Sequence, residues 1–189
     1  VPITTHSTAP SPDEFLELLA CAHSLADLAA PLTLQYFRTP MSIDNKASES
    51  DFDPVTAADR AAEEVMRQEI SRRFASHGVI GEEFADTGIE ARFRWVIDPI
   101  DGTRAFIMGW PMWGMLIGLM HDDMPYLGLM DQPFTKERFW STKDAAHFRY
   151  GDGTTGELKT RACGGLGTAV LSTTHPDLFA PGEEADGFG

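Results

Sequence analysis

Apolar residues recur at helical spacing near the start of the chain, between residues 15 and 28. They occupy one face of a predicted amphipathic helix, at Phe15, Leu18, Leu19, Ala22, Leu25 and Leu28. Ser11, Pro12 and Glu14 predict its start, because serine caps a first turn, proline suits the first helical position and glutamate completes a capping box. We expect Pro31 to kink or interrupt this helix, since proline has no main-chain N–H to donate.

A second amphipathic helix is predicted from about Thr56 to Phe74. Its apolar face carries Val55, Ala58, Ala62, Val65, Met66, Ile70 and Phe74. Arginines and glutamates occupy the other positions, which we therefore place on the solvent face. Residues 39–53 are polar and loop-like, and they separate the two predicted helices. The region 11–74 is therefore predicted as a helical pair.

Beyond His77 and Gly78, which end the second helix, the pattern changes to short apolar runs. Residues 79–80 and 95–97 predict buried strands, and each runs straight into carboxylates. Further strands separated by turns are predicted at 115–120, 126–130, 138–141, 148–150, 157–159 and 169–172. Helices followed by an antiparallel meander indicate an α+β layered fold. Residues 78–175 are then mainly antiparallel sheet, and residues 176–189 form a loop or truncated linker.

Charge narrows the classes of function. The chain has 189 residues, with 29 acidic and 15 basic side chains and a formal net charge of −14. Such a chain offers no basic stripe for nucleic acid and little attraction to an anionic membrane. The longest uncharged apolar stretch, 105–120, is too short to span a bilayer. The start shows no signal pattern, so we expect a cytoplasmic protein.

Cys21 and Cys163 lie far apart and form no Cys-x-x-Cys motif. A zinc ribbon or disulfide scaffold is therefore not predicted, and a reducing compartment fits. We expect both cysteines to behave as small buried hydrophobic residues.

Three segments place carboxylates at the ends of predicted elements, where a rigid scaffold often presents binding groups. They are 53–59, which opens the second helix, Gly81-Glu82-Glu83, and 95–103. Taken singly, Glu82-Glu83 also fits a solvated pair, and Asp59 fits an exposed helical residue. Several carboxylates in one cleft would repel one another unless cations neutralised them.

The segment Asp98-Pro99-Ile100-Asp101-Gly102-Thr103 offers both metal ligands and a phosphate cradle. Proline stiffens the turn, and the Ile100 carbonyl is free to join the two aspartates around a hard cation such as Mg²⁺. Gly102 permits a backbone conformation that a side chain would block, and free N–H groups of Gly102 and Thr103 would hold phosphate oxygens. An ordinary surface turn remains the alternative for this segment alone.

Competing motifs fit less well. Asp98 and Asp101 are three apart and no loop of EF-hand type follows them. The haloacid-dehalogenase phosphatases have two aspartates only two apart, one of them a covalent nucleophile. No P-loop or Ser/His/Asp arrangement occurs, and the glycines of 164–167 are too loose for a dinucleotide fingerprint.

The three carboxylate segments resemble, in order and separation, the motifs of the inositol monophosphatase superfamily. Further segments are similar to its histidinol-phosphate phosphatase branch, at 103–106, 113–114, 131–134, 137–139, 160–163 and 173–176. The resemblance implies a layered α/β sandwich of the inositol monophosphatase and fructose-bisphosphatase type. It also implies a phosphomonoesterase with two to three Mg²⁺ ions and a homodimer.

The resemblance implies roles for matching positions. Glu82, Asp98 and the Ile100 carbonyl would hold a first Mg²⁺, Asp98 and Asp101 a second, and Glu82 a third through water. Thr103 and Asp59 would orient and deprotonate the attacking water, and Glu82 would be the third catalytic residue. Gly102, Thr103 and Asp101 would bind the phosphate or the substrate.

Two more positions are candidates on the same basis. Lys46 matches a loop lysine near the metals, with an exposed lysine as the alternative. Glu83 would be a neighbouring carboxylate outside the ligand set or a surface residue.

The expected reaction is hydrolysis of histidinol phosphate in histidine biosynthesis. The alternative substrates are inositol phosphate and other sugar phosphates. Members of the family continue into a second half with a Trp-Asp motif that completes the second metal site, and none of the four tryptophans here precedes an aspartate. A catalytically silent truncated protein that binds only metal or a partner is therefore a further alternative. The apolar run from Phe106 to Met115 fits either a subunit interface or ordinary core.

Overall fold

The computed structural model describes residues 10–39, 43–45, 54–170 and 172. Main-chain contacts divide the chain into two units, Val1–Leu158 and Lys159–Gly189. The first unit carries both long helices and the large sheet, and the described part of the second unit carries one short 3₁₀-helix, Leu166–Thr168. The boundaries predicted for the sheet region and the tail stay predictions.

The two predicted helices are present as α1 (Pro12–Tyr36) and α2 (Ala57–Arg73). The Ser11 hydroxyl accepts a hydrogen bond from the Glu14 N–H at 3.2 Å, as the capping prediction requires. The predicted interruption at Pro31 is wrong, because α1 continues to Tyr36. Ala29 and Thr33 on either side of the proline are fully buried, so packing holds the helix together there.

By length and composition alone, α1 would be apolar enough to cross a membrane. Core helices of globular proteins meet the same criterion. In this structure Leu18, Ala22 and Leu25 of α1 are buried in the core, and the helix packs against α2 and the sheet. Leu28, which was predicted on the same face, is 40% exposed, so the core covers only part of the predicted apolar face.

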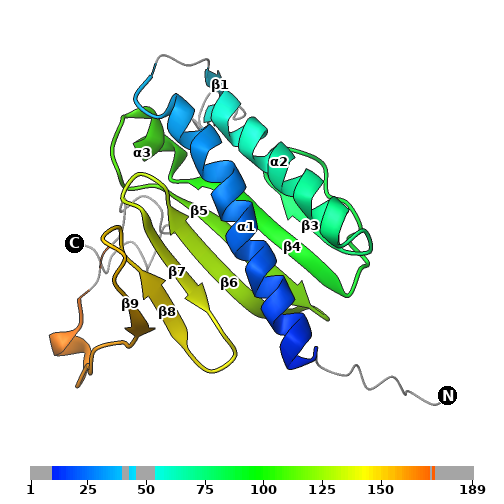
Figure 1. Cartoon of the computed structure of the whole chain (residues 1–189). Coiled ribbons are helices and arrows are strands. Elements are labelled where there is room, and N and C mark those ends of the chain that lie inside the picture. The colour runs from blue at the N-terminus through cyan, green and yellow to red at the C-terminus, as the bar shows by residue number, and fades with distance from the viewer. Residues whose placement is uncertain (1–9, 40–42, 46–53, 171, 173–189) are drawn as a thin grey trace, which may run out of the picture. The chain divides into compact units, whose positions relative to one another are not determined.

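Seven strands form one sheet in the order β3-β4-β5-β6-β7-β8-β9 (Figure 1). Their bounds are β3 Gly78–Gly81, β4 Phe93–Asp101, β5 Gly114–His121, β6 Met124–Gln132, β7 Glu137–Ser141, β8 Ala146–Arg149 and β9 Thr155–Leu158. All neighbours are antiparallel except β3 and β4, which are parallel. The predicted meander and hairpin are confirmed, and the parallel pair makes the sheet mixed.

Two further differences from the sequence prediction concern short segments. Ile43–Asn45 (β1) and Pro54–Thr56 (β2) form an antiparallel pair in the region expected to be loop. The strand predicted at 169–172 is wrong at 169, 170 and 172, which are not in a strand, and residue 171 lies outside the described residues. A short helix α3 (Thr103–Ile107) follows β4.

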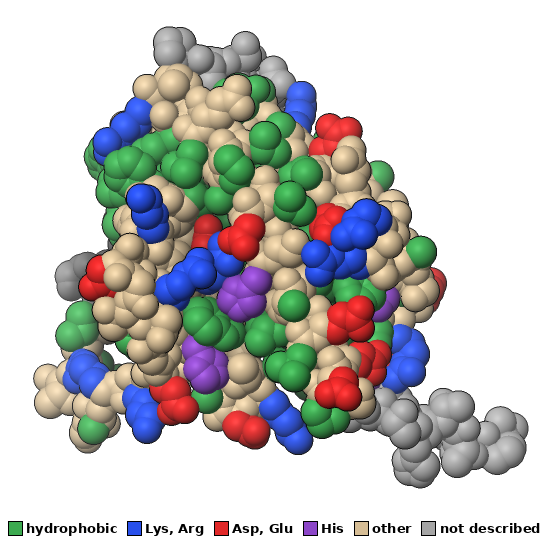
Figure 2. All heavy atoms as spheres, in the orientation of Figure 1, with side chains coloured by type: hydrophobic (Ala, Val, Ile, Leu, Met, Phe, Trp, Pro, Cys, Tyr) green, Lys and Arg blue, Asp and Glu red, His purple; other side chains and the backbone are tan. Residues whose placement is uncertain are grey.

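Helices α1 and α2 cover one face of the sheet (Figure 1). The core between them takes alternate residues of the central strands, at Trp95, Ile97, Met115, Ile117, Leu119, Leu127 and Leu129. On the outer side of the helical layer, acidic and basic side chains are interspersed (Figure 2). The sheet is thus buried on this side by an amphipathic layer.

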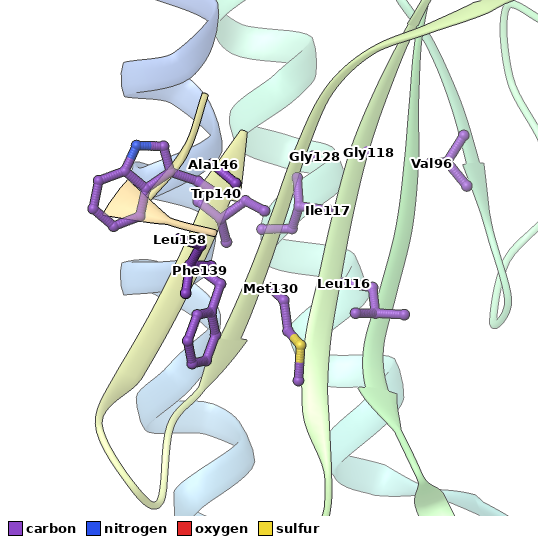
Figure 3. A pocket seen from close by; sticks show the side chains of 11 residues that line it. Val96, Leu116, Ile117, Gly118, Gly128, Met130, Phe139, Trp140, Ala146 and Leu158 are labelled. Carbon is purple, nitrogen blue, oxygen red and sulfur yellow. The ribbon is translucent and has the colours of Figure 1, made fainter. Parts of the chain in front are cut away.

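The opposite face of the sheet is also apolar. It forms an open hollow of about 470 Å³ lined by side chains that include Val96, Leu116, Met130, Phe139 and Leu158 (Figure 3). Val96 and Leu116 keep 39% and 36% of their surface exposed. In the described residues, the central strands therefore carry apolar side chains on both faces of the sheet.

Candidate metal centre

Strand β4 delivers the principal carboxylates to one end of the sheet. Asp98 pairs with Leu116 of β5, whereas Asp101 pairs with Gly114, so β4 has an extra residue over this interval. Such a bulge turns side chains out of the regular alternation and is common beside active sites. It brings both aspartates to the point where the strand ends and α3 begins.

A local hydrogen-bond network fixes this turn. The Ile100 N–H donates to Asp98 Oδ1 at 3.1 Å, and the Thr103 hydroxyl donates to the Ile100 carbonyl at 3.0 Å. Gly102 has φ 87°, and a Cβ there would lie 2.9 Å from the Met112 carbonyl oxygen. Glycine is therefore required at this position by both conformation and space, as the sequence predicted.

The electrostatics link Asp98 to the other carboxylates. Burial, together with the negative charges of Glu82 and Asp101, raises the pKa of Asp98 from 3.8 to about 7. The hydrogen bond from the Ile100 N–H acts in the opposite direction. The three carboxylates thus lie close enough to repel one another, and a bound cation would relieve that repulsion.

Glu82 and Glu83 follow β3 directly. Glu82 is exposed, while the Glu83 side chain is only 3% exposed and its Oε2 lies 3.6 Å from Arg60 Nε. The alternative of Glu83 as a surface residue is therefore wrong, because its carboxylate is packed against the N-terminal part of α2. We expected Glu83 to lie near the metal ligands without being one of them, and that expectation stays a prediction.

Asp59 is in the first turn of α2 and is 4% exposed. An exposed helical residue, the simpler interpretation of this aspartate, is therefore wrong. A buried carboxylate needs compensating interactions, and the predicted role of Asp59 toward the attacking water stays a prediction. Lys46 and the start of the first motif, Asp53, lie outside the described residues.

The donor types fit a hard divalent cation, since carboxylates and a main-chain carbonyl are what Mg²⁺ binds. In the part of the chain that the structure describes, no group of three or more His, Cys, Asp or Glu side chains is arranged to hold a metal ion. The predicted set relies on the Ile100 carbonyl as well as on side chains. The fit therefore rests on donor chemistry and on the mutual repulsion at Asp98.

One site residue escaped the sequence prediction. Glu63 was placed with the other glutamates on the solvent face of α2, but it is fully buried. It accepts main-chain hydrogen bonds from Glu82, Glu83 and Phe84 and pairs with Arg67. The available signal was its spacing of four from Asp59, which places both on one side of the helix.

The apolar run after α3 divides into two sets. Phe106, Trp113 and Met115 are buried, as the core interpretation predicts. Met108, Trp110 and Met112 are 56%, 57% and 74% exposed. The exposed set leaves the interface interpretation open for this loop.

Comparison with known proteins gives a consistent result. The model of the inositol monophosphatase family matches residues 15–185. The bifunctional phosphatase IMPL2 of Arabidopsis thaliana is 39% identical over 93% of this chain and 49% of its own length. Histidinol-phosphatases of Mycobacterium tuberculosis and Streptomyces coelicolor are 38% and 40% identical, each over 71% of this chain and 51% of their own length.

Among solved structures, an inositol monophosphatase from Zymomonas mobilis superposes with a TM-score of 0.73 at 40% identity. The match covers 90% of this chain and 62% of that chain. The chain spans about half the length of the curated relatives named above.

Proposed function

We propose, because this chain belongs to the inositol monophosphatase family, that it carries the metal-binding part of a phosphatase acting on small phosphate monoesters. The observation that carries the proposal is the turn at the end of β4. There the charges of Asp101 and of Glu82, which follows β3, raise the pKa of the partly buried Asp98, and the Ile100 carbonyl accepts a hydrogen bond from the Thr103 hydroxyl.

The residues divide into three tasks. Glu82, Asp98, Asp101 and the Ile100 carbonyl would hold two to three Mg²⁺ ions. When bound, these ions neutralise charge on the phosphate and lower the pKa of a coordinated water. Asp59 and Thr103 would orient the attacking water and accept its proton, and the N–H groups of Gly102 and Thr103 would bind phosphate oxygens beside Asp101.

We propose histidinol phosphate as the substrate, within histidine biosynthesis. Support comes from the histidinol-phosphatases of Mycobacterium tuberculosis and Streptomyces coelicolor, at 38% and 40% identity. Inositol phosphate is the second candidate, because the Zymomonas mobilis inositol monophosphatase is 40% identical. Both substrates would use the same carboxylates, so the alcohol half decides between them.

Phosphate release tests this proposal. We expect the 189-residue chain with Mg²⁺ to release phosphate from histidinol phosphate faster than from inositol 1-phosphate. Asp98→Asn should abolish release from both, because it removes a charge shared by two ions. A clear preference for inositol phosphate would reject the substrate choice.

The same assay addresses the alternative that the chain is a catalytically silent protein binding only metal or a partner. Turnover that depends on Asp98 excludes that alternative. If the chain binds Mg²⁺ but releases no phosphate from either substrate, the result would favour the catalytically silent protein over the proposed activity.

We also propose that the protein is a cytoplasmic homodimer. The exposed Met108, Trp110 and Met112 support the dimer, since clustered exposed apolar side chains are typical of interfaces. Sedimentation velocity giving the mass of one chain would reject it.

A further inference from the structure

We propose that the buried pair Glu63 and Arg67 of α2 positions the metal-binding segment after β3, and in particular Glu82. The inference rests on the proposed function, because it assigns a role toward the proposed metal centre. It concerns two residues that the metal-binding motifs do not include.

The Glu63 carboxylate is saturated by donors. Its Oε2 accepts the N–H groups of Glu82 and Glu83 at 3.0 and 2.8 Å. Its Oε1 accepts the N–H of Phe84 at 3.2 Å and Arg67 Nε at 2.7 Å. Three successive main-chain N–H groups thus converge on one fully buried carboxylate, as they would around a bound anion.

Arg67 secures the same segment through its carbonyls. Its guanidinium donates to the Phe84 and Ala85 carbonyl oxygens, each at 3.1 Å. The pair therefore holds residues 82–85 by both donors and acceptors, from a helix that is itself fixed in the core. Because these are charge-assisted hydrogen bonds, they are stronger than ordinary turn contacts.

Gly81 shows how closely α2 approaches this segment. A Cβ at position 81 would overlap the Glu63 carboxylate and come within 2.8 Å of Arg67 Nη2. The glycine of the Gly81-Glu82-Glu83 motif is thus required by the pair rather than by a turn. The pair and the motif form one unit, in which Glu63 sets the main-chain path of the ligand Glu82.

If the pair had only a structural role, its loss would lower stability. It would then change metal affinity no more than the loss of other contacts of α2 does. Partners of metal ligands behave differently, since their loss typically costs about 10- to 100-fold in affinity. The two roles are therefore separated by measuring affinity and stability on the same variants.

The test measures the affinity of the 189-residue chain for Mn²⁺ by calorimetry. Amide hydrogen exchange of residues 82–84 is measured on the same variants. We expect Glu63→Gln to weaken Mn²⁺ binding about 10- to 100-fold and to speed exchange at these amides. The substituted amide NH₂ group would face main-chain donors that need an acceptor.

Glu69→Gln is the matched control. Glu69 is on the same helix and pairs with Arg72 and Arg73, but it has no contact with residues 82–85 among its hydrogen bonds and ion pairs in the described structure. We expect the Glu69→Gln variant to bind Mn²⁺ with the affinity of the wild type, even if its melting temperature changes.

Arg67→Lys is the second variant and covers the case in which Glu63→Gln does not fold. Lysine keeps the charge but loses the planar fork, so the proposal requires weaker Mn²⁺ binding in it. Wild-type affinity in either folded variant overturns the positioning role alone. Absence of Mn²⁺ binding in the wild type overturns the proposed metal centre as well, so the two failures are distinguishable.

Discussion

At the scale of single residues, short-range chemistry was readable from the sequence and long-range chemistry was not. The turn from Asp98 to Thr103 is built by hydrogen bonds that span two and three residues, so its residue types predict it. Glu63 bonds to residues 19 to 21 positions away. Its spacing of four from Asp59 places both carboxylates on one side of α2, but the pattern of the helix does not show that residues 82–84 cover that side.

The two cysteines also differ from the expectation that both are buried. Cys21 is buried, as predicted, and that burial raises its pKa to about 11. Cys163 is exposed, and a hydrogen bond with Thr168 lowers its pKa. The prediction failed for Cys163 because its surroundings, residues 159–170, bury none of their side chains.

Thiol titration at pH 8 follows from this difference. We expect a disulfide reagent to modify one thiol per native chain and two in denaturant. Cys163→Ser should abolish the native reaction, and Cys21→Ser should leave it unchanged. Native reaction at both thiols would contradict the burial of Cys21.

The same burial gives a pH dependence with a defined sign. The folded-state pKa of Cys21 lies above its ordinary value of 9.0. Its contribution to stability is therefore fully present below pH 9.0 and is lost as pH rises toward about 11. Cys21→Ser should reduce the loss of stability over that interval.

At the scale of elements, hydrophobic periodicity located both long helices and the central strands. It missed the parallel pairing of β3 with β4, because a strand's own pattern carries no direction. It also missed the pair β1–β2, whose strands of three residues each are too short to show a period. The error at Pro31 had another cause, namely that packing outweighed the local propensity of proline.

Pro31→Ala tests how much the proline inside α1 lowers the stability of the protein. The substitution supplies an N–H that can donate to the Asp27 carbonyl one turn earlier, and Pro31 is exposed, so packing is unchanged. We expect the free energy of unfolding to rise by about 1–3 kcal/mol, measured by urea denaturation.

Pro12→Ala is the matched control, because a proline in the first helical turn removes no helical hydrogen bond. Its stability should stay within about 0.5 kcal/mol of the wild type. Equal effects of the two substitutions would show that Pro31 is not strained by its place in the helix.

At the scale of the whole molecule, the net charge of −14 gains a local meaning. Part of it, at Asp59, Glu82, Asp98 and Asp101, belongs to the proposed cation site. The chain covers 49–51% of the length of the curated relatives named above. In the apolar hollow on the face of the sheet opposite the helices, Val96 and Leu116 stay partly exposed. Sequence pattern predicts which residues are apolar but not which face of a sheet stays open.

Divalent-metal binding to the chain tests the central claim most directly. In a titration with Mn²⁺ followed by electron paramagnetic resonance, we predict at least one bound ion per wild-type chain. Asp98→Asn should lose this binding, because Asp98 is the carboxylate shared between the predicted ions. The exposed Asp123, paired with Arg94 at the other end of the sheet, gives the control Asp123→Asn, which should bind as the wild type does. Binding by Asp98→Asn equal to that of the wild type, or no binding by the wild type, would contradict the account.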